Sequence, residues 1–234
     1  MLTKYTESDF KEGQVLLIDK PLEWTSFDVV NKIRYAIRKT FGIRKIKVGH
    51  AGTLDPLATG LLIICTGKAT KQINEFMGQP KEYTGTIQLG STTPSYDLET
   101  EPDHTFPTEH ITPELVEEVI RKQFTGDIMQ TPPVFSAIKK EGQKAYELAR
   151  QGIQMKMEKR PVQITSFETE LKEDVIHFRV ECSKGTYIRS LAHDLGQALQ
   201  SGGHLSALRR TSIGTYSVED ALDPLQFAAQ LNQE

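Results

Sequence analysis

The most informative stretch of this sequence is a loop that sets one acid among residues with special backbone requirements. Residues 49–60 read Gly-His-Ala-Gly-Thr-Leu-Asp-Pro-Leu-Ala-Thr-Gly, so three glycines and a proline lie within twelve positions. This density of glycine and proline indicates a loop held in one unusual shape. Asp55 lies inside the loop, directly before an apolar run, where a fixed carboxylate suits nucleophilic or basic chemistry. Because aspartate before proline is also common in ordinary turns, the loop alone leaves a purely structural turn open.

Other kinds of chemistry find little support in the sequence. The two cysteines, Cys65 and Cys182, lie far apart in apolar runs, so we expect buried free thiols and no redox pair. The sequence has no zinc-ligand spacing, and Gly67-Lys68 fails the rest of the phosphate-loop pattern. The residue types therefore favour chemistry by side chains alone.

Charged residues are segregated along the chain, although the net charge is only −3. Residues 29–54 contain no acid but have seven cations, which are Lys32, Arg34, Arg38, Lys39, Arg44, Lys45 and Lys47. From Glu82 to Ile120 the pattern is reversed, with several acids and no lysine or arginine. Such segregation is typical of a face that attracts phosphate, although a solvated basic helix accounts for the same sequence equally well.

Hydrophobic periodicity predicts the elements that must position the loop. Apolar or alternating runs indicate strands at residues 15–18, 61–65, 83–89, 134–138, 162–164 and 176–182. Helical spacing and capping residues indicate helices that start near residue 25 and at 69–77, 113–124, 143–151 and 188–199, with a short strand and a final helix after residue 211. In the first helix, the predicted buried stripe consists of Phe27, Val30, Ile33 and Ile37.

The order of these elements limits the possible fold classes. Strands and helices alternate without a regular β-α-β rhythm, which favours an α+β fold with a mixed, largely antiparallel sheet flanked by helices. No apolar run approaches the roughly 20 residues that span a bilayer, and the first ten residues lack an apolar signal core. We therefore expect a cytoplasmic protein that forms a single domain over residues 1–234, with its core at about 13–215 and a candidate inserted subregion at about 91–130.

Five segments, in the same order along the chain, resemble the motifs of TruB-type pseudouridine synthases, which make pseudouridine in the T-loop of tRNA. They are residues 17–21 (Leu-Ile-Asp-Lys-Pro), 49–60, 81–83 (Lys-Glu-Tyr), 182–189 (Cys-Ser-Lys-Gly-Thr-Tyr-Ile-Arg) and 208–210 (Leu-Arg-Arg). The similarity runs from about Val15 to Ile213, and five ordered motifs are far more specific than any single one. The chain departs from the family at residues 91–99, where Asp97 is kept but Pro94 is added and a family glycine is missing.

This resemblance implies a pseudouridine synthase fold and an active site built around Asp55. The matching aspartate is the essential catalytic residue of the family, and the residue that matches Arg189 pairs with it. Burial raises the pKa of a carboxyl group whereas a nearby cation lowers it, so such a partner would keep Asp55 ionised. Tyr83 matches a tyrosine that stacks on the target uracil and assists a proton transfer. Without the motifs, Arg189 resembles an ordinary surface arginine and Tyr83 a core aromatic.

Four further residues are assigned by the same resemblance. The histidine that matches His50 fills the space left when the target base leaves its stack. Tyr187 and Leu208 match residues that line the same pocket, and Lys20 matches a lysine that supports the active-site loop or contacts phosphate. On the sequence alone, His50 could instead pair with Asp55 as a general base or have a structural role in the loop. Tyr187 and Leu208 could equally be core residues, and Lys20 could be an ordinary turn lysine.

The implied reaction limits what else the protein needs. Pseudouridine formation detaches uracil from C1′, rotates it and rejoins it through C5, so nothing is oxidised and no cofactor is required. The implied partner is the T-arm stem-loop of tRNA, with U55 as the target, and we expect a monomer without membrane contact or an obligatory protein partner. Only about twenty residues follow Ile213, so we expect no C-terminal RNA-binding PUA domain, and the cations at 32–47 must then contribute to RNA affinity.

Two other functions remain as alternatives. The runner-up is a protein that binds tRNA and assists its folding, in which isomerase activity is secondary and Asp55 is dispensable for the main benefit. The other is a hydrolase with an aspartyl nucleophile, which would need a metal or leaving-group site. No suitably spaced acidic cluster lies near Asp55 in the sequence, so the hydrolase is the weaker alternative.

Overall fold

The computed structural model describes residues 5–136, 139–140, 143–144 and 157–231. The chain divides into two compact units. Unit 1 consists of Met1–Tyr83 and Leu208–Glu234, and unit 2 consists of Thr84–Ala207. Two strands, β4 (Lys81–Leu89) and β12 (Gly203–Ile213), continue along the chain from one unit into the other.

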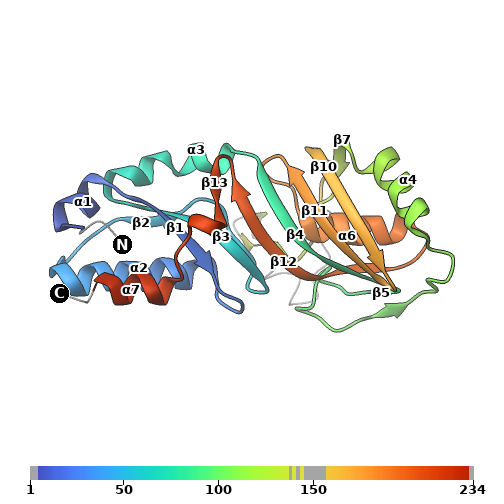
Figure 1. The fold of residues 1–234 in the computed structure, drawn as a ribbon, viewed down its shortest axis with the longest axis horizontal. Coiled ribbons are helices and arrows are strands. Elements are labelled where there is room, and N and C mark those ends of the chain that lie inside the picture. The colour runs from blue at the N-terminus through green and yellow to red at the C-terminus, as the bar shows by residue number, and fades with distance from the viewer. Residues whose placement is uncertain (1–4, 137–138, 141–142, 145–156, 232–234) are drawn as a thin grey trace. The chain divides into compact units, whose positions relative to one another are not determined.

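Unit 1 carries the 49–60 loop on a small mixed sheet with helices around it (Figure 1). Besides its parts of β4 and β12, its elements are α1 (Glu7–Glu12), β1 (Val15–Lys20), α2 (Ser26–Phe41), β2 (Val48–His50), β3 (Ala58–Thr66), η1 (Gly67–Gln72), α3 (Ile73–Gly78), β13 (Tyr216–Ser217), η2 (Val218–Asp220) and α7 (Pro224–Leu231). The strands and helices predicted at 15–18, 61–65, 69–77 and after residue 211 are confirmed, with shifted ends.

Strand β3 is the centre of this sheet. It pairs antiparallel with β1, from Val15 opposite Cys65 to Lys20 opposite Gly60. Its first residues pair in parallel with β12, and its last residues pair antiparallel with β2. The segment between β2 and β3 therefore leaves the sheet and returns to it beside β12, and this segment contains Asp55.

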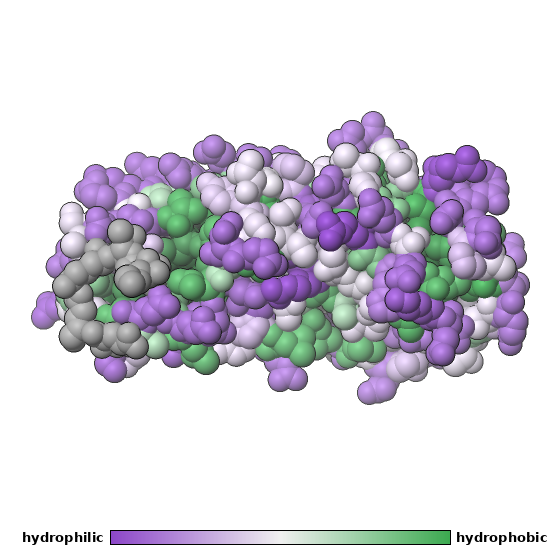
Figure 2. Space-filling model, viewed as in Figure 1, coloured by the Kyte–Doolittle hydropathy of each residue, from purple (hydrophilic) through white to green (hydrophobic). Residues whose placement is uncertain are grey.

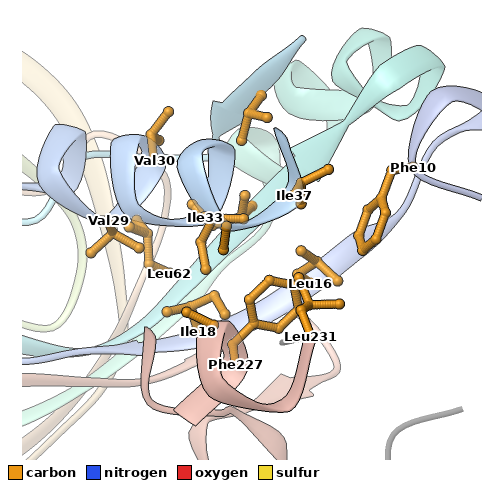
Figure 3. Close-up of a cluster of buried hydrophobic side chains, with 14 of the residues drawn as sticks. Phe10, Leu16, Ile18, Val29, Val30, Ile33, Ile37, Leu62, Phe227 and Leu231 are labelled. Atoms are coloured by element: carbon orange, nitrogen blue, oxygen red, sulfur yellow. The ribbon is translucent and has the colours of Figure 1, made fainter. Parts of the chain in front are cut away.

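Because β3 is apolar from Leu61 to Cys65, it can be buried on both faces of the sheet. Leu62 and Ile64 join a core cluster with the inner face of α2 and with Phe227 of α7. Figure 3 shows Leu62 and Phe227 among the side chains of this cluster. Leu61 and Ile63 point to the opposite face and pack with residues of η1 and α3. Figure 1 shows the corresponding layers, with α2 and α7 on one side of these strands and α3 on the other. Cys65 is a buried free thiol, as predicted.

Helix α2 begins at a capping box in which Thr25 and Asp28 exchange hydrogen bonds with each other's backbone N–H groups. The predicted stripe is confirmed at Val30, Ile33 and Ile37, but it is wrong at Phe27, whose side chain is 61% exposed. At 3.6 residues per turn, Phe27 lies about 120° around the helix from Ile33, the middle of the buried face. The buried face is completed instead by Val29 and Ala36.

Unit 2 contains a second set of strands with α4 and α6. Its strand order is β12-β4-β11-β10-β7, and the registered pairings of β10 with β11 and with β7 are antiparallel. The elements that lie only in this unit are β5 (Ser91–Thr92), β6 (His104–Thr105), α4 (Pro113–Gln123), β7 (Gly126–Gln130), β8 (Lys139–Lys140), β9 (Gln143–Lys144), β10 (Arg160–Lys172), β11 (Val175–Cys182) and α6 (Ile188–Ala198). The α+β class with a mixed, mostly antiparallel sheet is thereby confirmed.

Most predictions in unit 2 are confirmed, and the errors lie between α4 and β10. Strand β11 alternates between exposed and buried positions, and α6 buries the predicted stripe from Ile188 to Leu199. The strand predicted at 134–138 is wrong for its first three residues, which form a bend after two prolines, and its last two lie outside the described residues. In the helix predicted at 143–151, Gln143 and Lys144 are instead in β9, and the remainder lies outside the described part.

Among the residues that the structure describes, eight large apolar side chains are exposed, and they are spread over both units. Figure 2 shows hydrophilic residues over much of the visible face, interrupted by separate hydrophobic patches. In the described part of the chain, no helix combines the length and apolar character needed to cross a membrane.

Candidate active site

The segment between β2 and β3 is tied to the sheet at both ends. The backbone N–H of Ala51 donates to the carbonyl of Ile63 at 2.9 Å, and that of Ala58 donates to the carbonyl of Asp55 at 3.0 Å. Gly52 has φ of +96°, a left-handed conformation that favours glycine. The side chain of Asp55 lies on this loop in a half-buried position.

The residue before Asp55 is held by the start of α2. The hydroxyl of Ser26 accepts a hydrogen bond from the N–H of Leu54 at 2.9 Å and donates to its carbonyl at 3.1 Å. Both Ser26 and the Leu54 side chain are buried. Because one hydroxyl satisfies both backbone groups of Leu54, the peptide bond leading into Asp55 has a defined orientation.

The residue after Asp55 is held by Lys20. This lysine is 0% exposed at the end of β1, and its ammonium donates to the carbonyls of Pro21 at 2.8 Å, Trp24 at 2.5 Å and Pro56 at 3.3 Å. Burial lowers the pKa of Lys20 to about 8, while the carboxylate of Asp55 acts in the opposite direction. The ammonium therefore supports the loop backbone and lies within electrostatic range of Asp55.

A buried arginine that the sequence analysis did not assign to the site supports the other side of the loop. Arg210 of β12 is 1% exposed, and its guanidinium donates to the carbonyls of Leu61 at 2.8 Å and Gly52 at 3.1 Å. Its place in the Leu-Arg-Arg motif was the sequence feature that pointed to a role in the site. Nothing in the sequence shows that the loop carbonyls are its acceptors.

The neighbouring Arg209 makes a different connection. Its guanidinium forms a bidentate ion pair with Asp19 of β1, with N–O distances of 3.0 and 2.7 Å. It also donates to the hydroxyl of Thr59 at 3.4 Å. Since β1, β3 and β12 are adjacent, this pair ties together the three strand ends that surround the loop.

His50 ends β2, directly before the loop. Burial lowers its pKa, the Arg210 guanidinium lowers it further, and the backbone of Gly52 opposes this only in part. The imidazole is therefore neutral at neutral pH, which suits a ring that fills space better than one that carries charge. Leu208 is half-buried and lies opposite Ala58 in the parallel pairing of β12 with β3.

The remaining predicted residues lie at the boundary of unit 1 or within unit 2. Tyr83, the last residue of unit 1, lies on β4 and is only 7% exposed. Tyr187 caps α6 and is bracketed by Gln130, whose side-chain amide bonds its N–H at 2.8 Å and its carbonyl at 3.0 Å. The guanidinium of Arg160 lies 4.6 Å from the centre of the Tyr187 ring.

Arg189 is not the surface arginine that its place early in α6 suggested without the motif. Its side chain is buried, and its guanidinium donates to the carbonyls of Ser95 at 3.1 Å and Phe135 at 2.8 Å. The carboxylate of Asp97 lies 3.6 Å from its Nε. Asp97, which the sequence analysis noted only for its place in a divergent segment, is therefore an ionic partner of Arg189.

The structure thus brings Lys20, His50, Asp55 and Leu208 together around one loop in unit 1, and Tyr187 with Arg189 at the start of α6 in unit 2. The pairing of Arg189 with Asp55 joins residues of different units and stays a prediction. Within the described residues, no group of three or more His, Cys, Asp or Glu side chains could hold a metal ion. What the loop offers chemically is a positioned carboxylate on a rigid backbone.

Comparison with known proteins shows the family to which the chain belongs. The model of the TruB family pseudouridylate synthase N-terminal domain matches residues 38–188, and that of the tRNA pseudouridylate synthase B C-terminal domain matches residues 189–234. The chain is 59% identical over 228 residues to tRNA pseudouridine synthase B of Flavobacterium johnsoniae, covering 97% of this chain and 99% of that protein. It is 58% identical to the protein of the same name from Phocaeicola vulgatus, covering 97% and 96% of the two chains.

A solved structure extends the likeness to three dimensions. In a crystal structure of a Cbf5-Nop10-Gar1 complex, one chain matches 95% of this chain with a TM-score of 0.70 and 28% identity. The match covers 55% of that longer chain. The family model alone spans more than half of the sequence, and the relatives match nearly all of it. The chain therefore belongs to the TruB family of pseudouridylate synthases.

Proposed function

We propose that this chain converts a uridine in the T-loop of tRNA, U55, to pseudouridine, with Asp55 as the catalytic carboxylate. The observation that carries the proposal is the double support of Asp55: Leu54 before it is held by Ser26, and Pro56 after it by Lys20. Because the backbone is held on both sides of Asp55, the half-buried carboxylate has a defined place in the loop against which a base and a ribose can be positioned. The names of the 59% and 58% identical relatives support the same reaction and the same class of RNA.

The chemistry requires the carboxylate to be ionised. Whether it attacks the sugar, attacks the base or removes a sugar proton, Asp55 must offer an electron pair as the bond between uracil and C1′ breaks. The uracil then turns, C5 bonds to C1′, the C5 proton is lost and N1 takes up a proton, so the product is an isomer of the substrate. These steps need no cofactor.

Arg189 is proposed as the cation that keeps Asp55 ionised. A guanidinium buried at the start of α6 and held by two carbonyls has little freedom, so it can serve as a fixed positive charge. The ammonium of Lys20 adds a second positive charge from within unit 1.

The other predicted residues are proposed to bind the flipped nucleotide. Tyr83 stacks on the target uracil and assists the transfer of its C5 proton. His50, neutral because its pKa is lowered, fills the space that the uracil leaves in the RNA stack. Tyr187 and Leu208 line the pocket, and Lys20 supports the loop.

We further propose that the two units act as one catalytic domain, as a cytoplasmic monomer whose partner is the T-arm of tRNA. The support is a family match that continues through both units, since it runs from residue 38 to residue 234. The alternative, a protein whose main role is to bind and fold tRNA, shares this surface but does not require Asp55.

The experiment compares the wild-type chain with Asp55→Asn on an unmodified tRNA transcript, with pseudouridine mapped by position and RNA affinity measured in parallel. We expect the wild type to modify U55, and Asp55→Asn to bind tRNA normally but form no product. Asp220→Asn, which removes an exposed carboxylate of the same unit, is the control and should behave as wild type. Product formation by Asp55→Asn would overturn the catalytic assignment, and rescue of growth by that variant would favour the folding role.

A further inference from the structure

The cations of residues 32–47 are distributed unequally between structural and solvent-exposed positions. Five of the seven are exposed, which are Arg38, Lys39, Arg44, Lys45 and Lys47. Arg34 is half-buried and serves the fold, because its guanidinium donates to the side chain of Asn31 at 2.9 Å and to the carbonyl of Val48 at 3.1 Å. We name the five exposed cations, together with Tyr35, the basic face.

The cations of the basic face lack the ionic partners that other lysines of unit 1 have. Lys11 is paired with Glu7, and Lys68 with Glu12. Across residues 5–136 and 157–231, none of the five has a carboxylate within ion-pair distance, and the one hydrogen bond from the group is that of Arg38 Nε to the carbonyl of Ile43 at 3.3 Å. Five neighbouring positive charges without counter-charges repel one another, and an anionic ligand would relieve that repulsion.

An exposed aromatic accompanies these charges. Tyr35 is 62% exposed and lies on the outer side of α2, with Arg38 and Lys39 one helical turn further on. Phe27, also on the outer side, precedes it by two turns. Aromatic rings interleaved with cations are a pattern of surfaces that bind nucleic acid, where rings contact bases and cations contact phosphates.

The basic face is joined to the frame of the Asp55 loop at both ends. Ser26 in the first turn of α2 holds Leu54, and Arg34 holds Val48 at the start of β2, which leads through His50 into the loop. α2 has 16 residues, so the face extends about 24 Å from the loop at a rise of about 1.5 Å per residue. An RNA with one nucleotide at Asp55 is long enough to follow it.

We propose that the basic face binds the phosphate backbone of the same RNA whose uridine reaches Asp55, and that Tyr35 contacts a base or sugar of that RNA. This inference rests on the proposed function, because it takes the RNA substrate as the ligand. It adds a contact surface that lies outside the active site and entirely within unit 1. The cations supply the salt-dependent part of the affinity, and Tyr35 supplies a part that is independent of salt.

The test measures binding of an unmodified tRNA transcript to full-length variants over a range of salt concentrations. The first variant is the triple Arg44→Ala, Lys45→Ala, Lys47→Ala. A milder pair, Lys39→Gln with Lys45→Gln, covers the case in which the triple fails to fold. Tyr35→Ser tests the aromatic contact, and Lys11→Ala with Lys68→Ala is the control that removes two paired lysines.

Removing one cation that binds a phosphate should reduce the slope of log K against log salt by roughly 0.7–0.9, so the slope should fall by about two and a half for the triple and by about one and a half for the pair. Tyr35→Ser should weaken binding by about fivefold or more with an unchanged slope. The control should keep both the slope and the affinity. At saturating RNA, every variant should form product at the wild-type rate, because the basic face touches no reacting atom.

A wild-type slope in both the triple and the pair would overturn the proposal, even if Asp55→Asn confirms the catalytic role. A control that lowers the slope as much as the triple would overturn it as well, since net charge alone would then be responsible. Failure of the proposed function is a separate result: the wild-type chain would form no pseudouridine whatever the salt dependence of its binding.

Discussion

The carboxylate of Asp97 lies 3.6 Å from the Nε of Arg189, and both side chains are buried within unit 2. The remaining guanidinium nitrogens donate to carbonyls of Ser95 and Phe135. The arginine proposed to act on Asp55 is thus itself oriented by a carboxylate and by two backbone groups from a different part of the chain. Such support reduces the reorganisation needed when substrate binds.

Replacing this carboxylate should destabilise the protein. Asp97→Asn removes the negative charge but keeps an oxygen for the N–H of Glu99, which Asp97 now accepts at 3.0 Å. Because the two carbonyl acceptors of Arg189 remain, we expect a loss of about 1–3 kcal/mol in the free energy of unfolding, measured by urea titration. Glu101→Gln, at an exposed acid of the same segment, should change it by less than about 0.5 kcal/mol. Equal stabilities for Asp97→Asn and the wild type would show that the ion pair contributes nothing.

Removing the hydroxyl of Tyr83 should separate binding from chemistry. Tyr83→Phe keeps the ring that stacks on uracil, so the affinity for tRNA should stay within about twofold of wild type. It lacks the group proposed to assist the proton transfer, so the single-turnover rate at saturating RNA should fall by about 10²-fold. Tyr216→Phe, which removes a hydroxyl from another aromatic of unit 1, should leave the rate unchanged. A wild-type rate for Tyr83→Phe would leave the ring with a packing or stacking role alone.

Gly60 should not tolerate a side chain, because β12 passes directly over it. Its φ is +105°, and an added Cβ would lie 2.7 Å from the backbone nitrogen of Arg210 and 2.9 Å from its carbonyl carbon. Strain and overlap together should lower the free energy of unfolding of Gly60→Ala by about 2–4 kcal/mol, measured by thermal or urea unfolding. Gly78→Ala is the matched control, since nothing lies within 4 Å of its added Cβ. An equally stable Gly60→Ala variant would contradict the close parallel pairing of β3 and β12.

Helices and strands could be predicted from the sequence wherever the apolar residues follow a single helical or strand periodicity. The stripe from Ile188 to Leu199 predicted α6, and the alternation from Ile176 to Cys182 predicted β11. β12 was expected only as a short strand after residue 211, although it begins at Gly203, because Arg209 and Arg210 interrupt its apolar pattern. β7 was missed, since Gly126 and Asp127 do not resemble strand residues.

For the site, the sequence predicted several of the residues but not the contacts that bury and hold them. Motif resemblance identified Asp55, His50 and Lys20, which the structure gathers around one loop. It did not reveal how Lys20 and Arg210 are buried, because a cation is buried only where carbonyl acceptors from other segments meet it. Two of those acceptors, Gly52 and Pro56, lie more than thirty residues from the cation that they bind, and no local pattern encodes these contacts.

The last prediction concerns Asp194, an acid on α6 that the proposed reaction does not use. Burial raises its pKa from 3.8 to about 6, and Lys159 opposes this only in part. Between these two pH values the folded protein binds more protons at this site than the unfolded chain does, so the stability falls as the pH rises through that range. The favourable contribution of the protonated acid is complete below about pH 4 and is lost above about pH 6.

Asp194→Asn removes the cost of burying an ionised carboxylate, which the folded protein bears above about pH 6. At neutral pH we expect a gain on the order of 1–3 kcal/mol in the free energy of unfolding, which should vanish as the pH approaches 4. Urea titrations at a series of pH values measure the difference directly. Asp127→Asn, at an exposed carboxylate of β7 nearby, should show no such dependence. A gain for Asp194→Asn that stays constant from acid to neutral pH would mean that the charge of Asp194 is not its cause, and that the amide stabilises α6 by new hydrogen bonds instead.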